Sequence, residues 1–261
     1  MNTLKKLIFI FIIILLFSCD SHSQTTIIIS NNIAKSKTVK VAGLTWQSNS
    51  IGTADNLDAT IQELSEQSIF EMFQYPSETL EYLNVGAGNN RSNPGEHGIE
   101  LGMAQYLTVP IKMPKYGINN TGIDVHMQGG IGYTNYHTLF VDPLLAQLDS
   151  QNINYQFIQI FFGGEEDANS DALSLAFPAK LDTLVSQYQS KFGSDVNLIF
   201  IEISALGRPY SARINDAYVA KAATSPYIHV IPSRNLSTAL HFQYAPMKEV
   251  GRQVALLINS L

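Results

Sequence analysis

Short apolar segments that alternate with longer amphipathic ones constrain the fold of this chain most. The runs FIQIFF (157–162) and LIFIEI (198–203) are too short for typical helices and lack strict alternation of apolar and polar residues, which is typical of strands buried on both faces. Amphipathic stretches such as 175–192 and 211–223 lie between runs of this kind. Strands that alternate with helices form right-handed βαβ units. The sequence therefore predicts a three-layer α/β/α sandwich around a mostly parallel, flavodoxin-like sheet.

The first 18 residues have the composition of an export signal. Lys5 and Lys6 precede an almost unbroken apolar run that ends in Leu-Phe-Ser before Cys19. The run is shorter than the roughly 20 residues of a membrane-spanning helix, and its ending resembles a lipobox. Two interpretations are possible, a retained membrane anchor and a bacterial lipoprotein. We favour the lipoprotein, in which Cys19 is diacylated and becomes the new N-terminus.

This interpretation divides the chain into three parts. Residues 1–18 are the signal peptide, 19–37 a Ser/Thr/Asn-rich spacer that either stays extended or adds an edge strand at TTIIIS, and 38–261 one domain without internal repeats or linkers. The lipid on Cys19 then tethers the domain to a bacterial membrane, on the periplasmic or cell-surface side. Because Cys19 is the only cysteine, the mature domain has no disulfide and no cysteine metal site.

The charge and the motifs exclude several classes of function. Removal of 1–18 takes away two lysines and no acidic residue, so the formal net charge changes from −6 to −8. An acidic domain without a Lys/Arg cluster is a poor nucleic-acid binder. His126 and His137 flank a Gly-rich loop, but no zinc-motif or dinucleotide-motif spacing is present. We expect no nucleic-acid partner, no metal and no cofactor.

The same Gly-rich loop is followed by aromatic residues. Tyr133, Tyr136 and Phe140 come directly after it in the sequence. They either border a carbohydrate groove, where their rings stack on sugars, or pack under the edge of the sheet.

Polar residues follow three predicted strands. Ser48 comes after the first strand, Glu165 and Asp167 come after 157–162, and His241 lies before the final helix. In a parallel α/β sheet the ligand site lies beyond the carboxyl ends of the strands. We therefore expect these side chains at the same edge of the sheet.

Ser48 and His241 are candidates for nucleophilic catalysis. A serine esterase needs a hydroxyl, an imidazole that takes its proton, a group that orients the imidazole, and N–H donors for the oxyanion. Ser48 and His241 fill the first two roles. A serine in a turn and a histidine before a helix are more often structural, so the pair depends on its context.

Four blocks, in order, resemble a known family. WQSNS is similar to the Gly-Gln-Ser-Asn-Met block of the sialate O-acetylesterase-like carbohydrate esterases, a branch of the SGNH hydrolases. HGIELGMAQYL resembles that family's Gly-Pro-Glu-Leu helix, and IQIFFGGEEDA its Trp-Tyr-Gln-Gly-Glu-Ser-Asp-Ala block. ALHFQYAPMKEVGRQVA resembles a closing segment in which Asp-x-x-His precedes a Gly-x-Arg-x-Ala helix. The blocks span about residues 38–258. The resemblance implies an SGNH-type fold.

Carried over position by position, the resemblance assigns roles to four residues. Ser48 is the nucleophile, its own backbone N–H is an oxyanion donor, and His241 is the general base. Gln47 and Asn49 hold the turn and border the acyl pocket; the alternative is plain turn capping.

Three departures from the family pattern affect this site. Thr238 stands where the family has the acid of Asp-x-x-His, and Gly163 stands where it has the oxyanion-hole Gln. The family's Gly-Gly-Thr segment appears as 119–121, where Asn120 offers a backbone N–H and a side-chain amide. Glu165 matches a family Glu and is our candidate for a surrogate acid; the alternative is a carboxylate that ties its loop to backbone N–H groups.

The sequence thus predicts a serine carbohydrate O-acetylesterase that acts on an acetylated sugar or polysaccharide outside the cytoplasm. The alternative is a catalytically inactive SGNH-fold lipoprotein that binds glycans or acts in assembly, because both the acid and the Gln donor are lost. The oligomeric state is left open.

Overall fold

The computed structural model of this chain describes residues 38–52, 69–83, 97–206, 208–237 and 239–261, all within a unit that runs from Thr38 to Leu261. The predicted signal peptide, Cys19 and the spacer lie outside the described residues, and so does Thr238. No helix in the described ranges has the length and apolar character needed to cross a membrane.

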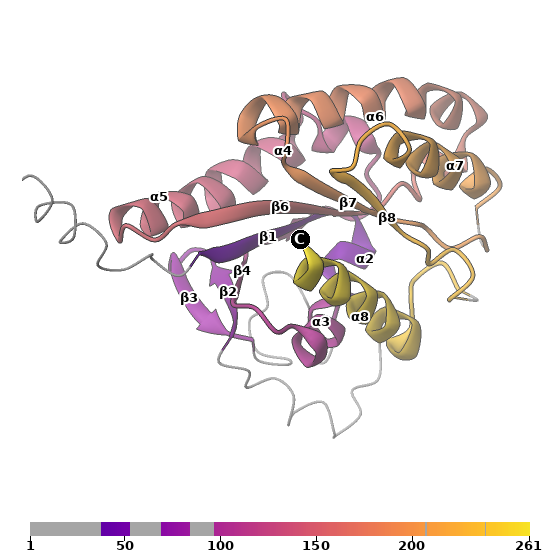
Figure 1. Ribbon diagram of the computed structural model, residues 1–261. Coiled ribbons are helices and arrows are strands. Elements are labelled where there is room, and N and C mark those ends of the chain that lie inside the picture. The colour runs from indigo at the N-terminus through magenta and orange to yellow at the C-terminus, as the bar shows by residue number, and fades with distance from the viewer. Residues whose placement is uncertain (1–37, 53–68, 84–96, 207, 238) are drawn as a thin grey trace, which may run out of the picture. The chain divides into compact units, whose positions relative to one another are not determined.

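One mixed sheet forms the middle layer (Figure 1). Its strand order is β3-β2-β4-β1-β6-β7-β8, with β5 also paired to β1. All strand pairs are parallel except β2 with β3. The strands are β1 (Val39–Trp46), β2 (Phe70–Gln74), β3 (Thr79–Tyr82), β4 (Ile111–Met113), β5 (Lys115–Gly117), β6 (Tyr155–Phe162), β7 (Asn197–Ile201) and β8 (Ile228–Ile231).

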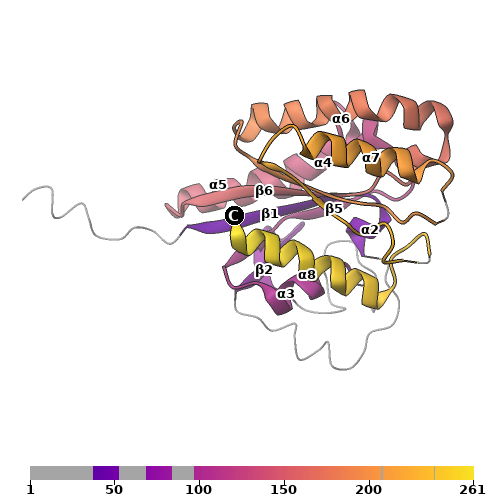
Figure 2. The same cartoon turned by 45° about the vertical axis from the view of Figure 1, so that its right-hand side comes forward.

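Helices cover both faces of this sheet, as Figures 1 and 2 show. On one face α3 (Glu100–Tyr106) and α8 (Tyr244–Ser260) share an apolar core with the strands. The second core lies on the other face, under α4 (Ile131–Tyr136), α5 (Asp142–Ser150), α6 (Asp171–Phe192) and α7 (Ser211–Ala222). The predicted three-layer α/β/α sandwich with a mostly parallel sheet is confirmed.

A proline divides the strand beside β1 into β4 and β5. Pro114 has no N–H to donate, yet its carbonyl accepts a hydrogen bond from Leu44 N at 3.0 Å. The chain therefore stays next to β1 after the interruption, and Ile118 N donates to Trp46 O at 2.9 Å. This continuation brings the 118–121 loop to the carboxyl end of β1.

Two glycines let α8 approach α3 closely. A Cβ added at Gly102 would lie 2.2 Å from Lys248 O, and one at Gly251 would lie 2.1 Å from Ile99 O. Any side chain at either position would push the two helices apart. Because His241 lies just before α8, this close contact also helps to set where the histidine can reach.

One amphipathic stretch gives a strand rather than a helix at its end. Residues 57–73 have a helical pattern in the sequence, but Phe70–Gln74 form β2, and the part before residue 69 lies outside the described residues. Phe70, Met72 and Phe73 are fully buried. Burial against β4 and the core outweighs the local helical pattern here.

Candidate active site

The nucleophile turn, residues 46–49, lies at the carboxyl end of β1. α2 (Ser48–Ile51) begins within this turn, with Gln47 as its N-cap residue. Trp46 is fully buried and has a φ of 129°, a region that costs a non-glycine residue about 1–3 kcal/mol. Such strain persists only where the surrounding contacts over-determine the backbone. The packing around buried Trp46 therefore holds the turn that presents Ser48.

Ser48 and His241 are brought together at this edge. Ser48 Oγ lies 2.9 Å from His241 Nε2, although the residues are 193 positions apart. Ser48 is half-buried and His241 is exposed. This distance is within the hydrogen-bond reach of a nucleophile and its general base. In the tautomer with an unprotonated Nε2, the hydroxyl donates to the imidazole.

Gln47 connects the nucleophile turn to the loop after β6. Its Oε1 accepts hydrogen bonds from Gly164 N at 2.8 Å and Glu165 N at 2.9 Å. The side chain is only 2% exposed. Gln47 thus holds the turn, as one part of the sequence prediction has it, but its amide oxygen is used inside the protein rather than on a ligand.

Asn49 links the turn to the histidine's segment. Its Nδ2 donates to Glu165 Oε1 at 2.6 Å, and its Oδ1 accepts from Phe242 N at 3.1 Å. Asn49 follows Ser48, and Phe242 follows His241. One buried amide therefore fixes the residue next to the nucleophile relative to the residue next to the base.

Glu165 lies beside Asn49 and not against His241. No hydrogen bond between Glu165 and His241 is found among the described residues, which differs from the contact expected of a surrogate acid. Its Oε2 is buried without a hydrogen-bond partner in that part of the chain, and burial raises the pKa of the carboxyl. The Glu165 carboxylate is therefore linked to the nucleophile turn through Asn49. This carboxylate holds the loop after β6 by accepting from the Asn49 amide. The backbone N–H groups of that loop donate to Gln47 instead.

The base loop, residues 233–243 without Thr238, is anchored at the end of β7. Ser233 Oγ donates to Glu202 O at 2.6 Å, and Arg234 Nη2 donates to Glu202 Oε1 at 2.6 Å. Further along, Ala239 N donates to Ser237 Oγ at 3.1 Å. Apart from its contact with Ser48, the His241 ring has no hydrogen bond to the rest of the described chain.

Donors for an oxyanion are present on the backbone. Within the described residues, the N–H groups of Ser48 and Asn49 donate to no other group, because the N-cap residue Gln47 makes no side-chain cap. Asn120 is exposed, with a φ of 54°. No contact between Asn120 and the dyad is found in the described part of the chain, so its predicted role stays a prediction.

Trp46 occupies the space that a side chain at Gly163 would need. A Cβ at Gly163 would lie 2.3 Å from both Cγ and Cδ1 of the Trp46 indole. The resembled family has Gly where this chain has Trp46 and Gln where it has Gly163. The Trp46 indole therefore fills the space beside Gly163, and position 163 offers no side-chain donor.

Asp167 and His126 brace the loop that leads away from β5. Asp167 Oδ2 accepts from Ile123 N at 3.0 Å, and burial raises the pKa of the carboxyl to about 7. His126 Nε2 lies 2.8 Å from Thr121 Oγ1, and burial lowers the pKa of this imidazole to about 3. The sequence placed Asp167 at this edge of the sheet. Its hydrogen bond with Ile123, and the contact of His126 with Thr121, could not be predicted from the sequence.

A buried ion pair between β5 and α3 was also not predicted from the sequence. Lys115 Nζ lies 2.9 Å from Glu100 Oε1, and both side chains are fully buried. The attraction of Lys115 and hydrogen bonds lower the pKa of Glu100 although its burial opposes this. The pair joins β5 to α3. Glu100 was visible as part of the block HGIELG, but nothing in the sequence pointed to its partner.

The described residues contain no group of three or more His, Cys, Asp or Glu side chains that could hold a metal ion. The arrangement is instead a hydroxyl, an imidazole and free backbone N–H groups at the edge of a parallel sheet. These are three of the four parts needed for acyl transfer to serine, and no group that orients the imidazole is found among the described residues.

Several solved structures share this fold. A protein from Arabidopsis thaliana aligns with a TM-score of 0.65 and 13% identity over 85% of this chain and 98% of its own. NanS aligns with a TM-score of 0.62 and 12% identity over 87% of this chain and 99% of its own. A carbohydrate acetylesterase from Xanthomonas citri aligns with a TM-score of 0.56 and 17% identity over 84% of this chain and 55% of its own. The chain has the SGNH-type, flavodoxin-like α/β fold.

Comparison of the sequence with models of protein families finds no match, and comparison with curated proteins finds no significant match either.

Proposed function

We propose that this protein is a serine carbohydrate O-acetylesterase. The observation that carries the proposal is the 2.9 Å contact between Ser48 Oγ and His241 Nε2 at the carboxyl edge of an SGNH-type sheet. The resemblance of the WQSNS block supports the same activity, as does the fold shared with a carbohydrate acetylesterase from Xanthomonas citri.

The proposed reaction has two steps. Ser48 Oγ attacks the acetyl carbonyl carbon while His241 Nε2 takes the hydroxyl proton, and backbone N–H groups at Ser48 and Asn49 stabilise the oxyanion. The imidazolium then protonates the departing sugar oxygen, which leaves an acetyl-Ser48 ester and a free sugar hydroxyl. Water attacks this ester with His241 as base, and acetate leaves as Ser48 recovers its proton.

The site is expected to be slow compared with a complete triad. Loss of the charged acid of a triad costs about 10⁴ in rate, and loss of an oxyanion donor costs about 10²–10³. Trp46 in place of the family's glycine, over Gly163, removes the side-chain donor. This observation also favours the second candidate, an inactive SGNH-fold protein that binds glycans or acts in assembly.

Hydrolysis of 4-nitrophenyl acetate and release of acetate from acetylated xylan distinguish the two candidates. We expect measurable turnover that falls by at least about 10³-fold in Ser48→Ala and His241→Ala. Ser50→Ala is the matched control, because Ser50 Oγ donates to Gln47 O in the same short helix and does not touch His241. Equal background rates in the parent and both dyad variants would contradict the esterase.

Covalent labelling tests the nucleophile without choosing a substrate. A fluorophosphonate reacts only with an activated serine, so we expect a single adduct at Ser48 that His241→Ala abolishes. If no adduct forms, glycan binding becomes decisive. Equal glycan affinity of the parent and Ser48→Ala, with turnover in neither, would establish the binding protein instead.

We also propose that the protein is exported and anchored by lipid at Cys19, on the periplasmic or cell-surface side of a bacterial membrane. The support is the charged, then apolar, N-terminal run and its Leu-Phe-Ser-Cys ending. This location suits an enzyme that acts on polymers outside the cytoplasm. Incorporation of labelled palmitate that Cys19→Ser abolishes would support the anchor, and an unlabelled protein in the soluble fraction would contradict it.

A further inference from the structure

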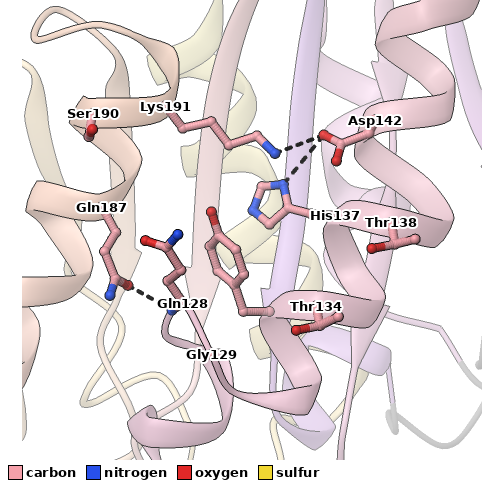
Figure 3. A pocket seen from close by; sticks show the side chains of 10 residues that line it. Gln128, Gly129, Thr134, His137, Thr138, Asp142, Gln187, Ser190 and Lys191 are labelled. Atoms are coloured by element: carbon pink, nitrogen blue, oxygen red, sulfur yellow. Dashed lines mark hydrogen bonds and ion pairs between the residues drawn. The ribbon is translucent and has the colours of Figure 1, made fainter.

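A separate pocket lies among the helices that follow the Gly-rich loop. It has a volume of about 530 Å³ and opens between this loop, α4, the π-helix η4 (His137–Val141) and α6 (Figure 3). Ligand pockets commonly measure about 300–1,000 Å³. None of its lining residues belongs to the Ser48–His241 site, so anything bound here is not a reacting group.

His137 gives this pocket an unsatisfied polar group. Its side chain is only 4% exposed, and neither ring nitrogen has a hydrogen-bond partner within the described residues. Asp142 Oδ1 lies 3.9 Å from Nδ1, beyond hydrogen-bond distance. Buried polar atoms are rarely left unpaired. His137 also begins the π-helix η4, and short π-helical segments often occur at functional sites.

The protonation of His137 restricts what can satisfy it. Burial, with a smaller effect of Lys191, lowers the pKa of the imidazole to about 3. The neutral ring has one N–H donor and one acceptor nitrogen. Because the ring is neutral and both nitrogens are buried, His137 adds no charge to the pocket and favours neither an anion nor a cation.

The charges at the rim balance each other. Lys191 Nζ lies 2.8 Å from Asp142 Oδ1, and Figure 3 shows this pair beside the His137 ring. An ion pair already formed contributes little net charge to the pocket, and the chain as a whole has a net charge of −6. An uncharged ligand fits these conditions.

The remaining lining offers amides and hydroxyls. Gln187 Oε1 accepts from Gln128 N at 2.8 Å, which leaves the N–H groups of the Gln187 amide for a ligand (Figure 3). Thr138 and Ser190 add hydroxyl groups to the lining. The set is more polar than that of a typical small-molecule pocket.

One aromatic ring completes the pocket. Tyr133 is partly buried, and its ring centroid lies 4.2 Å from that of His137. Tyr136 and Phe140 are 0% and 3% exposed and pack in the core. Of the three aromatic residues after the Gly-rich loop, only Tyr133 lines the pocket. Tyr136 and Phe140 pack in the core, as the second alternative from the sequence predicts, and the carbohydrate groove stays a prediction.

We propose that this pocket is a second, non-catalytic binding site for one or two uncharged sugar units of a glycan. Sugar hydroxyls pair with the Gln187 amide and with the Thr138 and Ser190 hydroxyls of the lining, and the apolar C–H face of a sugar ring packs on Tyr133. The proposal stands on residues outside the dyad, and it goes beyond the proposed esterase activity.

Ligand-observed saturation-transfer NMR on the full-length Ser48→Ala protein tests it. The probes are xylobiose, cellobiose and N,N′-diacetylchitobiose, and we expect at least one to bind with a Kd of about 1 mM. Tyr133→Ala and Gln187→Ala should weaken that binding by at least about tenfold. Gln189→Ala, another half-buried glutamine of α6 that does not line the pocket, should leave the Kd unchanged.

Two results would overturn the proposal. One is no saturation transfer to any of the three disaccharides; the other is binding that Tyr133→Ala and Gln187→Ala do not alter. Because Ser48→Ala cannot form an acyl-enzyme, neither result depends on esterase activity. Hydrolysis of 4-nitrophenyl acetate by Gln187→Ala, with Ser48 intact, reports separately on the dyad and should equal that of the parent.

Discussion

Ser48 stands in a turn whose neighbours on both sides are buried, whereas His241 is exposed in the loop before α8. The nucleophile turn is held by Gln47 and Asn49 and by a strained, fully buried Trp46. The base loop is anchored at Glu202, but its histidine ring forms a hydrogen bond only with Ser48 among described residues. The nucleophile side is positioned by buried side-chain hydrogen bonds and packing, and the base side by the hydrogen bonds at Glu202 and at Asn49. Substitutions in the nucleophile turn and in the base loop should therefore differ in how much they lower stability and in how they affect the reactivity of Ser48.

The largest effect is expected where Trp46 covers Gly163. Gly163→Gln should lower the free energy of unfolding by more than about 4 kcal/mol, because even its Cβ would overlap the indole. Trp46→Gly alone leaves a cavity that should lower the free energy of unfolding by about 3–5 kcal/mol. Part of this loss is offset because glycine relieves the backbone strain at φ 129°.

The double variant Trp46→Gly/Gly163→Gln should be more stable than the sum of the two changes by about 1–3 kcal/mol. It also restores a side-chain donor, so esterase activity should rise relative to Trp46→Gly alone. Urea denaturation of the four proteins measures the coupling. Strictly additive losses would mean that the two positions do not compensate each other.

The next effect concerns the amide that joins the two regions. Asn49→Leu leaves Phe242 N and Glu165 Oε1 unpaired and should cost about 2–4 kcal/mol. Because it also frees the segment next to His241, fluorophosphonate labelling of Ser48 should slow by at least about tenfold.

Asn215→Leu is the matched control for this change. Asn215 is also fully buried, and it makes two hydrogen bonds with the backbone of Ile203, both at 2.9 Å. It should lose similar stability while the labelling rate stays within about twofold of the parent. Equal slowing in both variants would show that Asn49 acts only through stability.

A further effect, dependent on pH, is expected at Asp167 on the nucleophile side. Its pKa is raised from 3.8 to about 7 by burial, so between these values the native state keeps a proton that the unfolded state has lost. The contribution of Asp167 to stability therefore falls as pH rises from about 4 to 7, by up to about 1.4 kcal/mol per pH unit, whereas the contributions of buried His126 and His137 rise over this range. Above pH 7 this contribution is constant.

Asp167→Asn should remove this slope and leave the protein relatively more stable at pH 7 than at pH 4, compared with the parent. Urea denaturation at several pH values measures it. Buried His126, with its pKa lowered to about 3, has the opposite slope, because the unfolded state binds the proton first as pH falls below about 6.5. An unchanged pH profile in Asp167→Asn would contradict the assignment.

The smallest effect is expected in the base loop. Ser237→Ala removes the hydroxyl that accepts from Ala239 N and lies 2.9 Å from Ala239 O. It should cost about 0.5–1.5 kcal/mol and reduce the labelling rate by only a few-fold. Ser50→Ala, in α2, provides the comparison from the nucleophile side. A larger loss of labelling from Ser237→Ala than from Asn49→Leu would reverse the comparison between the two regions.

Much of the framework was readable from local patterns. The run FIQIFF coincides with the last six residues of β6, and the amphipathic stretches 175–192 and 211–223 coincide with most of α6 and with α7. The hairpin partner β3 was not predicted, because three of its four residues are exposed and none is fully buried. The gathering of Ser48, Glu165 and His241 at one edge followed from the rule for parallel sheets. Which of them touch did not follow, and Glu165 turned out to bind Asn49.

The sequence by itself determined the mostly parallel sheet, the positions of central strands such as β6 and β7, and the edge at which the polar residues gather. Apolar runs and helical periods depend on near neighbours, so they can be read directly from the chain. Only the tertiary structure decided that Ser48 and His241 lie 2.9 Å apart, that Asn49 joins their segments, and that Trp46 fills the space at Gly163. These contacts join residues more than a hundred positions apart. They depend on how closely helices and loops pack, which no local pattern encodes.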